Sequence, residues 1–348
     1  GITAVPYHGE PSKVSLKFKA ESLKWKAEGR KLLPFRNFKL QTLNFKLSLY
    51  VLLVQHLQTV ITRFNHIAQN YSVPMLWELG TLPLNAAGMY LQRSQFGKAQ
   101  RESFGKHNRQ YLLYYLPPES IERKTTWIVF YHGGGWHFGQ PGMLPRLADF
   151  FLQLGYPIVM PAYRLSPRYQ FGHMREDLNL ALLKTFDIMQ DVAGRRENMI
   201  LAGASAGANL ADHLMYNTDV HRDLGVDSDL FKGFLSCAGP LDLRHLPDTF
   251  PLRAFTGGKH LSPAFDAANP INLIADDRQL PPALFIHGTA DRIVPYPSGK
   301  SFFELYKQRA EANLITLPNK WHLDSVRWTH DDLQTGEEIR AWLGEVEI

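Results

Sequence analysis

The sequence predicts an α/β fold with a mostly parallel central sheet and helices on both faces. From about residue 110 to the C-terminus, apolar runs typical of buried strands alternate with segments of helical periodicity. The strand-like runs are continuously hydrophobic, as expected where helices cover both faces of a parallel sheet. The 348 residues, 45% of them hydrophobic, are enough for one large domain of this kind with additions.

The expected elements follow a repeated strand-helix order. Strands are expected over 110–116, 127–132, 157–163, 198–203, 231–239, 283–288 and 313–318. Helices are expected over 174–189, 205–216, 298–309 and 334–343, where apolar residues recur at helical spacing. Residues 239–280 are rich in Pro, Asp and Leu and do not fit this order, so we expect them to form a lid-like insertion in a catalytic domain over 106–348.

Residues 1–105 precede the sheet and are expected to form a basic helical cap. The first 50 residues hold ten Lys and Arg against three Glu. The tetrapeptide NFKL recurs after seven residues, which is two helical turns, and this puts Lys39 and Lys46 on one side of a helix and leucines on the other. We expect the leucine side to pack on the main domain. Peripheral contact of this basic helix with an anionic membrane surface is the alternative.

Several features limit the compartment, cofactors and partners. Cys237 is the only cysteine, which excludes an intrachain disulfide, and its setting GFLSCAGP indicates a buried strand end in a reducing, cytoplasmic compartment. The apolar run 47–54 is far shorter than the roughly 20 residues that span a bilayer. The chain has no HExxH, CxxC, GxxxxGK or GxGxxG motif, so we expect no metal, no cofactor and no nucleic-acid partner. The sequence makes no prediction of oligomeric state.

The pentapeptide GASAG, residues 203–207, has the G-x-S-x-G pattern around Ser205. It joins an expected strand, NMILAG, to an expected helix, and small residues stand on both sides of the serine. A sharp strand-to-helix turn of this kind lifts a serine hydroxyl clear of the sheet, and only small neighbours let the helix follow. The pattern therefore predicts that Ser205 is a nucleophile.

A nucleophilic serine needs a histidine base and an acid that orients it. Asp291 follows the expected strand ALFIHG, and His322 follows the next one, NLITLP. Because carboxyl ends of parallel strands share one edge of a sheet, both side chains are expected to reach Ser205. Asp242, after the strand FKGFLSCAG, is the second candidate acid. The other histidines, His287 among them, are expected to be structural.

The stretch YHGGGW, residues 131–136, puts three glycines directly after the expected strand WIVFYH. Glycines let a loop turn its backbone N–H groups toward a substrate that lies close to the main chain. Such N–H groups stabilise the negative oxygen that forms when a serine attacks a carbonyl, and the N–H of Ala206 is a further donor. The loop is therefore predicted to be an oxyanion loop.

Together these motifs resemble the hormone-sensitive-lipase-like branch of the α/β-hydrolases, which includes carboxylesterases, acetylesterases and more distant arylformamidases. HGGGW, YRLSP, MREDL, GASAG, HGTAD and the last histidine carry the resemblance, which covers about residues 108–345. It implies an α/β-hydrolase fold, a helical N-terminal cap, and an oxyanion hole formed by Gly134, Gly135 and Ala206. The acid stands in HGTADRIVP, which is closer to peptidase and formamidase relatives than to the lipase-like pattern, so ester and amide substrates both stay open.

The predicted function is that of a carboxylesterase or lipase-like serine hydrolase acting on a small-molecule ester. Trp136 and Trp321 adjoin the oxyanion loop and the base, so we expect them to line an apolar substrate pocket for acyl or aromatic groups. An amidase or arylformamidase with the same triad is the alternative. A non-catalytic receptor with the hydrolase fold is a third hypothesis, although such proteins usually lack a triad member.

Overall fold

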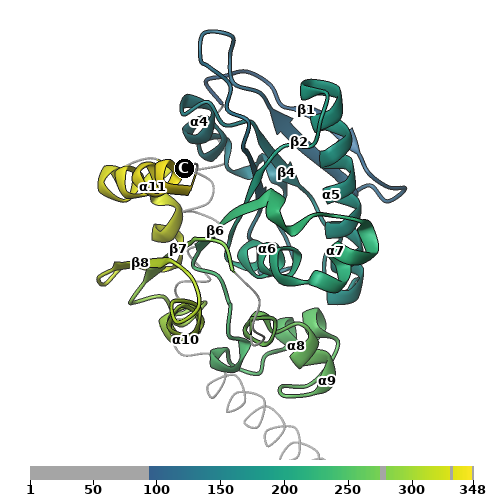
Figure 1. Ribbon diagram of the computed structural model, residues 1–348. Coiled ribbons are helices and arrows are strands. Elements are labelled where there is room, and N and C mark those ends of the chain that lie inside the picture. The colour runs from purple at the N-terminus through teal and green to yellow at the C-terminus, as the bar shows by residue number, and fades with distance from the viewer. Residues whose placement is uncertain (1–93, 275–279, 330–331, 347–348) are drawn as a thin grey trace, which may run out of the picture. The chain divides into compact units, whose positions relative to one another are not determined.

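The computed structural model describes residues 94–274, 280–329 and 332–346 (Figure 1). The expected basic cap, with Lys39 and Lys46, falls almost wholly outside these ranges, so its fold and any membrane contact stay predictions. Within the described ranges, no helix has both the length and the apolar character that crossing a bilayer requires.

The core of the domain is a sheet in which eight described strands lie in the order β1-β2-β4-β3-β5-β6-β7-β8. Six of them run parallel to one another. They are β3 (Trp127–Tyr131), β4 (Ile158–Pro161), β5 (Met199–Ala204), β6 (Phe231–Cys237), β7 (Ala283–Gly288) and β8 (Ala312–Leu317). Two antiparallel strands, β1 (Gln100–Ser103) and β2 (Tyr111–Tyr115), complete one edge. The mostly parallel sheet confirms the predicted α/β fold.

Among the described strands, β1 is the one that the sequence pattern did not predict. Its sequence QRES has no apolar run, and three of its four side chains are exposed. It forms because its backbone pairs with β2, from Gln100 opposite Tyr114 to Ser103 opposite Tyr111. Charged and polar side chains are common on an edge strand, where one side has no neighbour. The sheet therefore begins within residues 1–105, the segment that was expected to precede it.

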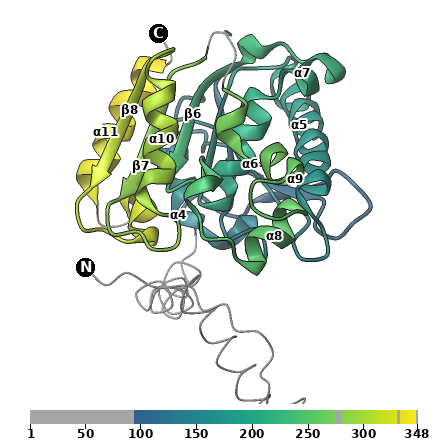
Figure 2. The same cartoon turned by 90° about the horizontal axis from the view of Figure 1, so that it is seen from below.

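Helices cover both faces of the sheet and create two cores (Figures 1 and 2). One face carries α4 (Pro145–Gln153) and α11 (Leu333–Val346), and the other carries α5 (Phe171–Ala193), α6 (Ala206–Tyr216), α7 (Thr218–Leu224) and α10 (Tyr296–Tyr306). All five side chains of β3 are buried: Trp127, Val129 and Tyr131 join the core under α5 and α6, and Ile128 and Phe130 join the other. This alternation explains why the strand runs are hydrophobic at every position.

The connection from β6 to β7 contains the segment expected to be a lid-like insertion. It forms η3 (Leu243–His245), α8 (Phe250–Thr256), α9 (Pro263–Ala267) and η4 (Pro270–Asn272) before the gap at 275–279. Cys237, which precedes it, is fully buried, and burial raises the pKa of its thiol to about 12. The cysteine therefore belongs to the core at the end of β6.

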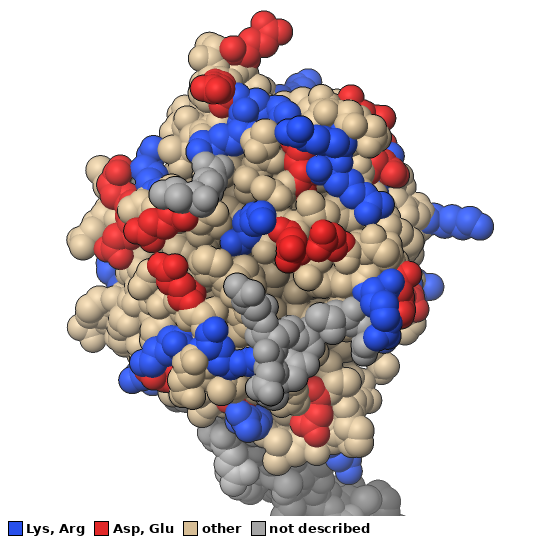
Figure 3. All heavy atoms as spheres, viewed as in Figure 1, with Lys and Arg blue, Asp and Glu red and all other residues tan. Residues whose placement is uncertain are grey.

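Charges of both signs are mixed on the molecular face drawn in Figure 3, where Lys and Arg side chains lie among Asp and Glu. Among the described residues, some side chains of opposite charge form ion pairs, such as Lys184 with Glu102 at 3.2 Å. A surface with interspersed charges produces only a weak net field, whereas attraction of a polyanion needs a field of one sign.

Asp212 of α6 is a buried carboxyl group whose oxygens have no hydrogen-bond partner among the described residues. Burial raises the pKa of this carboxyl well above its ordinary value of 3.8. The folded protein therefore keeps a proton that the unfolded chain releases once the pH exceeds that ordinary value. Stability that is fully present below this pH is lost as the pH rises toward the folded-state pKa.

Asp212→Asn is accordingly expected to stabilise the protein, and the gain should be larger at pH 8 than at pH 5. The amide resembles the protonated acid but cannot ionise, so the variant does not lose stability as the pH rises. Urea unfolding should give a free energy of unfolding at pH 8 that is higher by at least about 1 kcal/mol. A variant less stable than the wild type at pH 8 would mean that Asp212 is ionised and stabilising in the folded state.

Candidate active site

Ser205 lies at the sharp turn between β5 and α6. Its backbone has φ 52° and ψ −126°, an unfavourable conformation for a residue with a side chain. The flanking glycines make the turn possible: a Cβ on Gly203 would collide with the backbone of Gly207, and one on Gly207 would collide with the carbonyl of Tyr131. The G-x-S-x-G pattern thus reflects how closely α6 passes over β3 and β5.

His322 and Asp291 reach Ser205 from the ends of the two neighbouring parallel strands. Asp291 follows β7, and His322 opens η5 (His322–Thr329) after β8. The His322 Nε2 lies 2.8 Å from Ser205 Oγ, and its Nδ1 lies 2.7 Å from Asp291 Oδ2. The carboxylate can only accept, so Nδ1–H donates to it and the Nε2 lone pair faces the serine O–H. The three side chains form one continuous hydrogen-bonded chain.

Asp291 is almost fully buried and held by several donors besides His322. Its Oδ1 accepts the backbone N–H groups of Ile293 at 2.9 Å and Val294 at 2.8 Å. Its Oδ2 lies 3.3 Å from Nε2 of His287, which is also 2.9 Å from the carbonyl oxygen of Val294. Burial alone would raise the pKa of Asp291, but the two histidines hold the pKa of this carboxyl well below its ordinary value. The group is therefore ionised at neutral pH.

His287 is a neighbour of the acid that sequence reasoning treated as structural only. It lies four residues before Asp291, at the end of β7. The signal that could have found it is its position, since a residue at a strand end shares the edge of the sheet with the loop that follows. By contrast, Asp242 binds Arg244 through both oxygens, at 2.7 and 2.8 Å. Asp242, the second candidate acid, is thus paired with Arg244.

The glycine loop after β3 has an unusual backbone. Three consecutive residues have positive φ: Gly134 (123°), Gly135 (56°) and Trp136 (63°). The N–H groups of His137 and Phe138 both donate to the carbonyl of Gly134, at 3.0 and 3.1 Å, which closes the loop on itself. This geometry explains why residues 134 and 135 are glycines.

The glycine loop lies against the serine turn. A Cβ on Gly133 would lie 3.3 Å from the Cβ of Ser205. Among the described residues, none accepts a hydrogen bond from the backbone N–H of Gly134, Gly135 or Ala206. The Ser205 N–H, by contrast, donates to the carbonyl of Cys237 at 2.8 Å. The three predicted oxyanion donors therefore remain available to a ligand.

Gly134→Ala is expected to lower kcat for an ester substrate by about 10²–10³-fold, because the loop could no longer hold its N–H groups in place. At φ 123° the new Cβ would collide with the carbonyl of Phe138 in the same loop. Gly194→Ala is a matched control: its φ is also positive, at 70°, but a Cβ there meets open space at the end of α5. Equal kcat losses in both variants would contradict this role of the loop.

The two tryptophans expected to line the pocket differ in their surroundings. Trp136 is only 5% exposed and stacks on Phe255 of α8, with ring centroids 3.9 Å apart and planes 8° apart. It thereby joins the glycine loop to the segment between β6 and β7. Trp321 is 44% exposed beside His322, and its backbone N–H donates to Asp324 Oδ2 at 2.7 Å. Contact of either ring with a substrate stays a prediction.

Solved structures with this architecture include several esterases. A truncated carbohydrate esterase from gut microbiota superposes with a TM-score of 0.61 and 18% identity, covering 71% of this chain and 98% of that one. Esterase B of Lactobacillus rhamnosis, inhibited by a tributyrin phosphonate, gives a TM-score of 0.61 and 17% identity, covering 81% of this chain and 96% of that one. These structures confirm the α/β-hydrolase fold.

Several sequence relatives are esterases by name. A rice (Oryza sativa subsp. japonica) protein named "Probable isoprenylcysteine alpha-carbonyl methylesterase" is 24% identical over 252 residues, which cover 68% of this chain. The chain matches 59% of that protein's length. The relatives that the chain matches over about three fifths of their length thus include proteins named as esterases. The model of the family described as BD-FAE matches residues 113–306, which is more than half of the chain. The protein therefore belongs to the BD-FAE family of α/β-hydrolases.

Proposed function

We propose that this protein is a serine hydrolase that cleaves carboxylic esters with apolar acyl or aromatic groups. The observation that carries the proposal is the hydrogen-bonded chain from Ser205 Oγ through His322 to Asp291, with distances of 2.8 and 2.7 Å. A histidine within hydrogen-bond reach of a serine, and itself oriented by a buried carboxylate, is the arrangement that nucleophilic catalysis needs.

In the proposed mechanism, Ser205 Oγ attacks the ester carbonyl while His322 Nε2 takes the hydroxyl proton. The carbonyl oxygen becomes negative and is stabilised by the N–H groups of Gly134, Gly135 and Ala206. His322 then gives the proton to the leaving alcohol, and an acyl group remains on the serine. Water, activated by the same histidine, attacks this acyl-enzyme and releases the carboxylic acid. Asp291 stabilises the imidazolium that forms in each half of the cycle.

Apolar side chains near the serine support the choice of substrate. Phe138 of the glycine loop is 54% exposed and Trp321 beside the base is 44% exposed, so both rings lie at the surface on loops that carry the site. Exposed aromatic rings favour contact with apolar groups. The names of the relatives also support an ester substrate. The rice protein is called a probable methylesterase, and esterase B is inhibited by a tributyrin phosphonate.

The test compares an ester with the matching amide. Purified protein is expected to hydrolyse p-nitrophenyl butyrate with a kcat/KM at least about 100-fold above that for butyryl p-nitroanilide, a difference of roughly 2.7 kcal/mol in transition-state stabilisation. A series of p-nitrophenyl esters from acetyl to palmitoyl then gives the acyl preference. Faster hydrolysis of the anilide, or of a formyl amide, would establish the amidase alternative instead, which the HGTAD acid loop favours.

A further inference from the structure

Arg109, in the loop between β1 and β2, reaches both ends of the glycine loop. Its Nη2 donates to the carbonyl of Gly139 at 2.8 Å and lies 3.3 Å from Nε2 of His132. Its Nε donates to the carbonyl of Tyr163, just after β4, at 2.7 Å. His132 and Gly139 begin and end the segment 132–139, which contains two of the three predicted oxyanion donors, Gly134 and Gly135. One guanidinium group therefore bridges the base of this loop.

The imidazole of His132 is held in one protonation state by these contacts. Its Nδ1 lies 2.7 Å from the carbonyl of Gly133, so Nδ1–H donates there and Nε2 accepts from Arg109. Burial lowers the pKa of His132 to about 3, which keeps the ring neutral and able to accept. The ring also stacks on Tyr163, whose hydroxyl donates to the His132 carbonyl at 2.7 Å.

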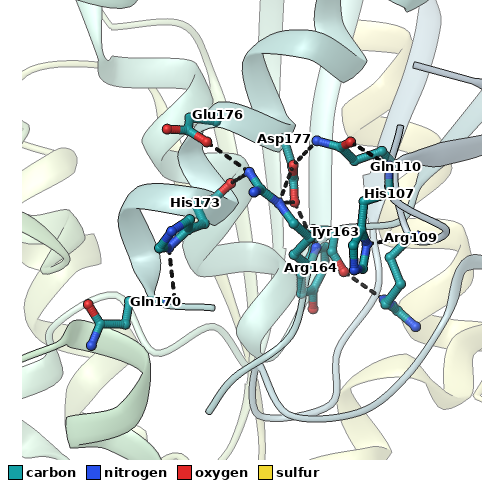
Figure 4. Close-up of polar contacts among 9 residues, drawn as sticks. All are labelled: His107, Arg109, Gln110, Tyr163, Arg164, Gln170, His173, Glu176 and Asp177. Carbon is teal, nitrogen blue, oxygen red and sulfur yellow. Dashed lines mark hydrogen bonds and ion pairs between the residues drawn. The ribbon is translucent and has the colours of Figure 1, made fainter. Parts of the chain in front are cut away.

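A buried carboxylate fixes the two segments that flank this contact (Figure 4). Asp177 of α5 accepts from Gln110 Nε2 at 2.9 Å, and from the backbone N–H and Nε of Arg164 at 2.7 and 2.9 Å. Gln110 and Arg164 directly follow Arg109 and Tyr163 in the chain. The backbone around Arg109 is thus anchored, and its side chain is held over the loop before any substrate binds.

We propose that Arg109 is a positioning residue that keeps the loop 132–139 in the conformation needed to bind an oxyanion. This inference rests on the proposed function. Trp136 is a non-glycine residue with positive φ, so it stores backbone strain and keeps this conformation only where surrounding contacts hold it. The planar, forked guanidinium group donates hydrogen bonds to three acceptors at once. A lysine ammonium group lacks this forked arrangement of donors. Arg109 itself does not touch the reacting atoms.

The test uses an ester and its thionoester, in which sulfur replaces the carbonyl oxygen. Sulfur is a weak hydrogen-bond acceptor, so the thionoester gains less from the loop N–H groups. Arg109→Met is expected to lower kcat for p-nitrophenyl butyrate by about 10–100-fold with KM little changed, since a misplaced donor costs transition-state stabilisation rather than binding. The loss for the thionoester should be smaller, so the ester-to-thionoester rate ratio falls. Arg109→Lys should give an intermediate ratio.

Arg123→Met is the matched control, because it removes another partly buried arginine. Arg123 pairs with Glu197 at 2.6 Å near the amino ends of β3 and β5, away from Ser205. The Arg123→Met variant should have a lower melting temperature and the same ester-to-thionoester rate ratio as the wild type. An unchanged ratio in both Arg109 variants, or in Arg109→Lys alone if the Met variant does not fold, overturns the inference. A wild type that hydrolyses neither ester overturns the proposed function and this inference with it.

Discussion

Replacing Ser205 with alanine is expected to lower kcat for p-nitrophenyl butyrate on the order of 10⁶-fold, the loss seen when a triad nucleophile is removed. The hydroxyl oxygen is the atom that would attack the ester, and nothing else on the hydrogen-bonded chain can replace it. The remaining activity would come from direct attack of water on the ester, with the N–H groups of the glycine loop still stabilising the negative oxygen. Steady-state rates and a thermal melt of the same preparation measure the effect.

Ser236→Ala is the matched control for this variant. Ser236 is a buried serine on β6 that lies beside Gly203 in the strand register, so it is close to the turn without belonging to the hydrogen-bonded chain. We expect its activity to stay near that of the wild type. A Ser205→Ala protein that keeps more than about one hundredth of the wild-type kcat would remove Ser205 from the mechanism, since this loss is far below the loss of a nucleophile.

Asp291→Asn is expected to lower kcat by about 10⁴-fold, because it changes which nitrogen of His322 carries the proton. The Oδ1 of Asp291 accepts two backbone N–H groups, from Ile293 and Val294, so the amide oxygen of an asparagine would take that place. Its NH₂ group would then face Nδ1 of His322 and donate to it. The histidine would carry its proton on Nε2, pointing at Ser205, and could not act as the base.

The control for this substitution is Asp242→Asn at the second candidate acid, which binds Arg244 instead. Its kcat should change by a few-fold at most. Both variants are compared with the wild type at pH 7 to 9, because a proton on the wrong nitrogen stays there wherever the imidazole is neutral. If Asp242→Asn shows the large loss and Asp291→Asn does not, the acid has been assigned to the wrong strand end.

The sequence was most informative where topology alone brings residues together. Ser205, Asp291 and His322 each follow an apolar run, and parallel strands place such positions at one edge of the sheet. That geometry made it possible to predict which three side chains meet, although their catalytic roles remain predictions. The glycine run was interpretable from local geometry, since Gly134 and Gly135 have positive φ, which residues with a side chain rarely adopt.

Contacts made by residues outside these motifs could not be predicted in this way. Arg109 reaches the glycine loop across 30 residues of sequence, through a side chain whose partners are mainly backbone carbonyls. Strand β1 forms by pairing of its backbone and has no apolar pattern. The burial of Trp136 depends on Phe255, more than a hundred residues later in the chain. In each case the interaction depends on tertiary packing and leaves no local periodicity.

Covalent labelling tests the central claim most directly. A fluorophosphonate reacts with a serine that a neighbouring histidine activates, and peptide mass mapping identifies the modified residue. We expect one adduct per chain, on Ser205, and no adduct in His322→Ala under the same conditions. Labelling at another residue, or equal labelling of Ser205 with and without His322, would contradict the assignment of this site.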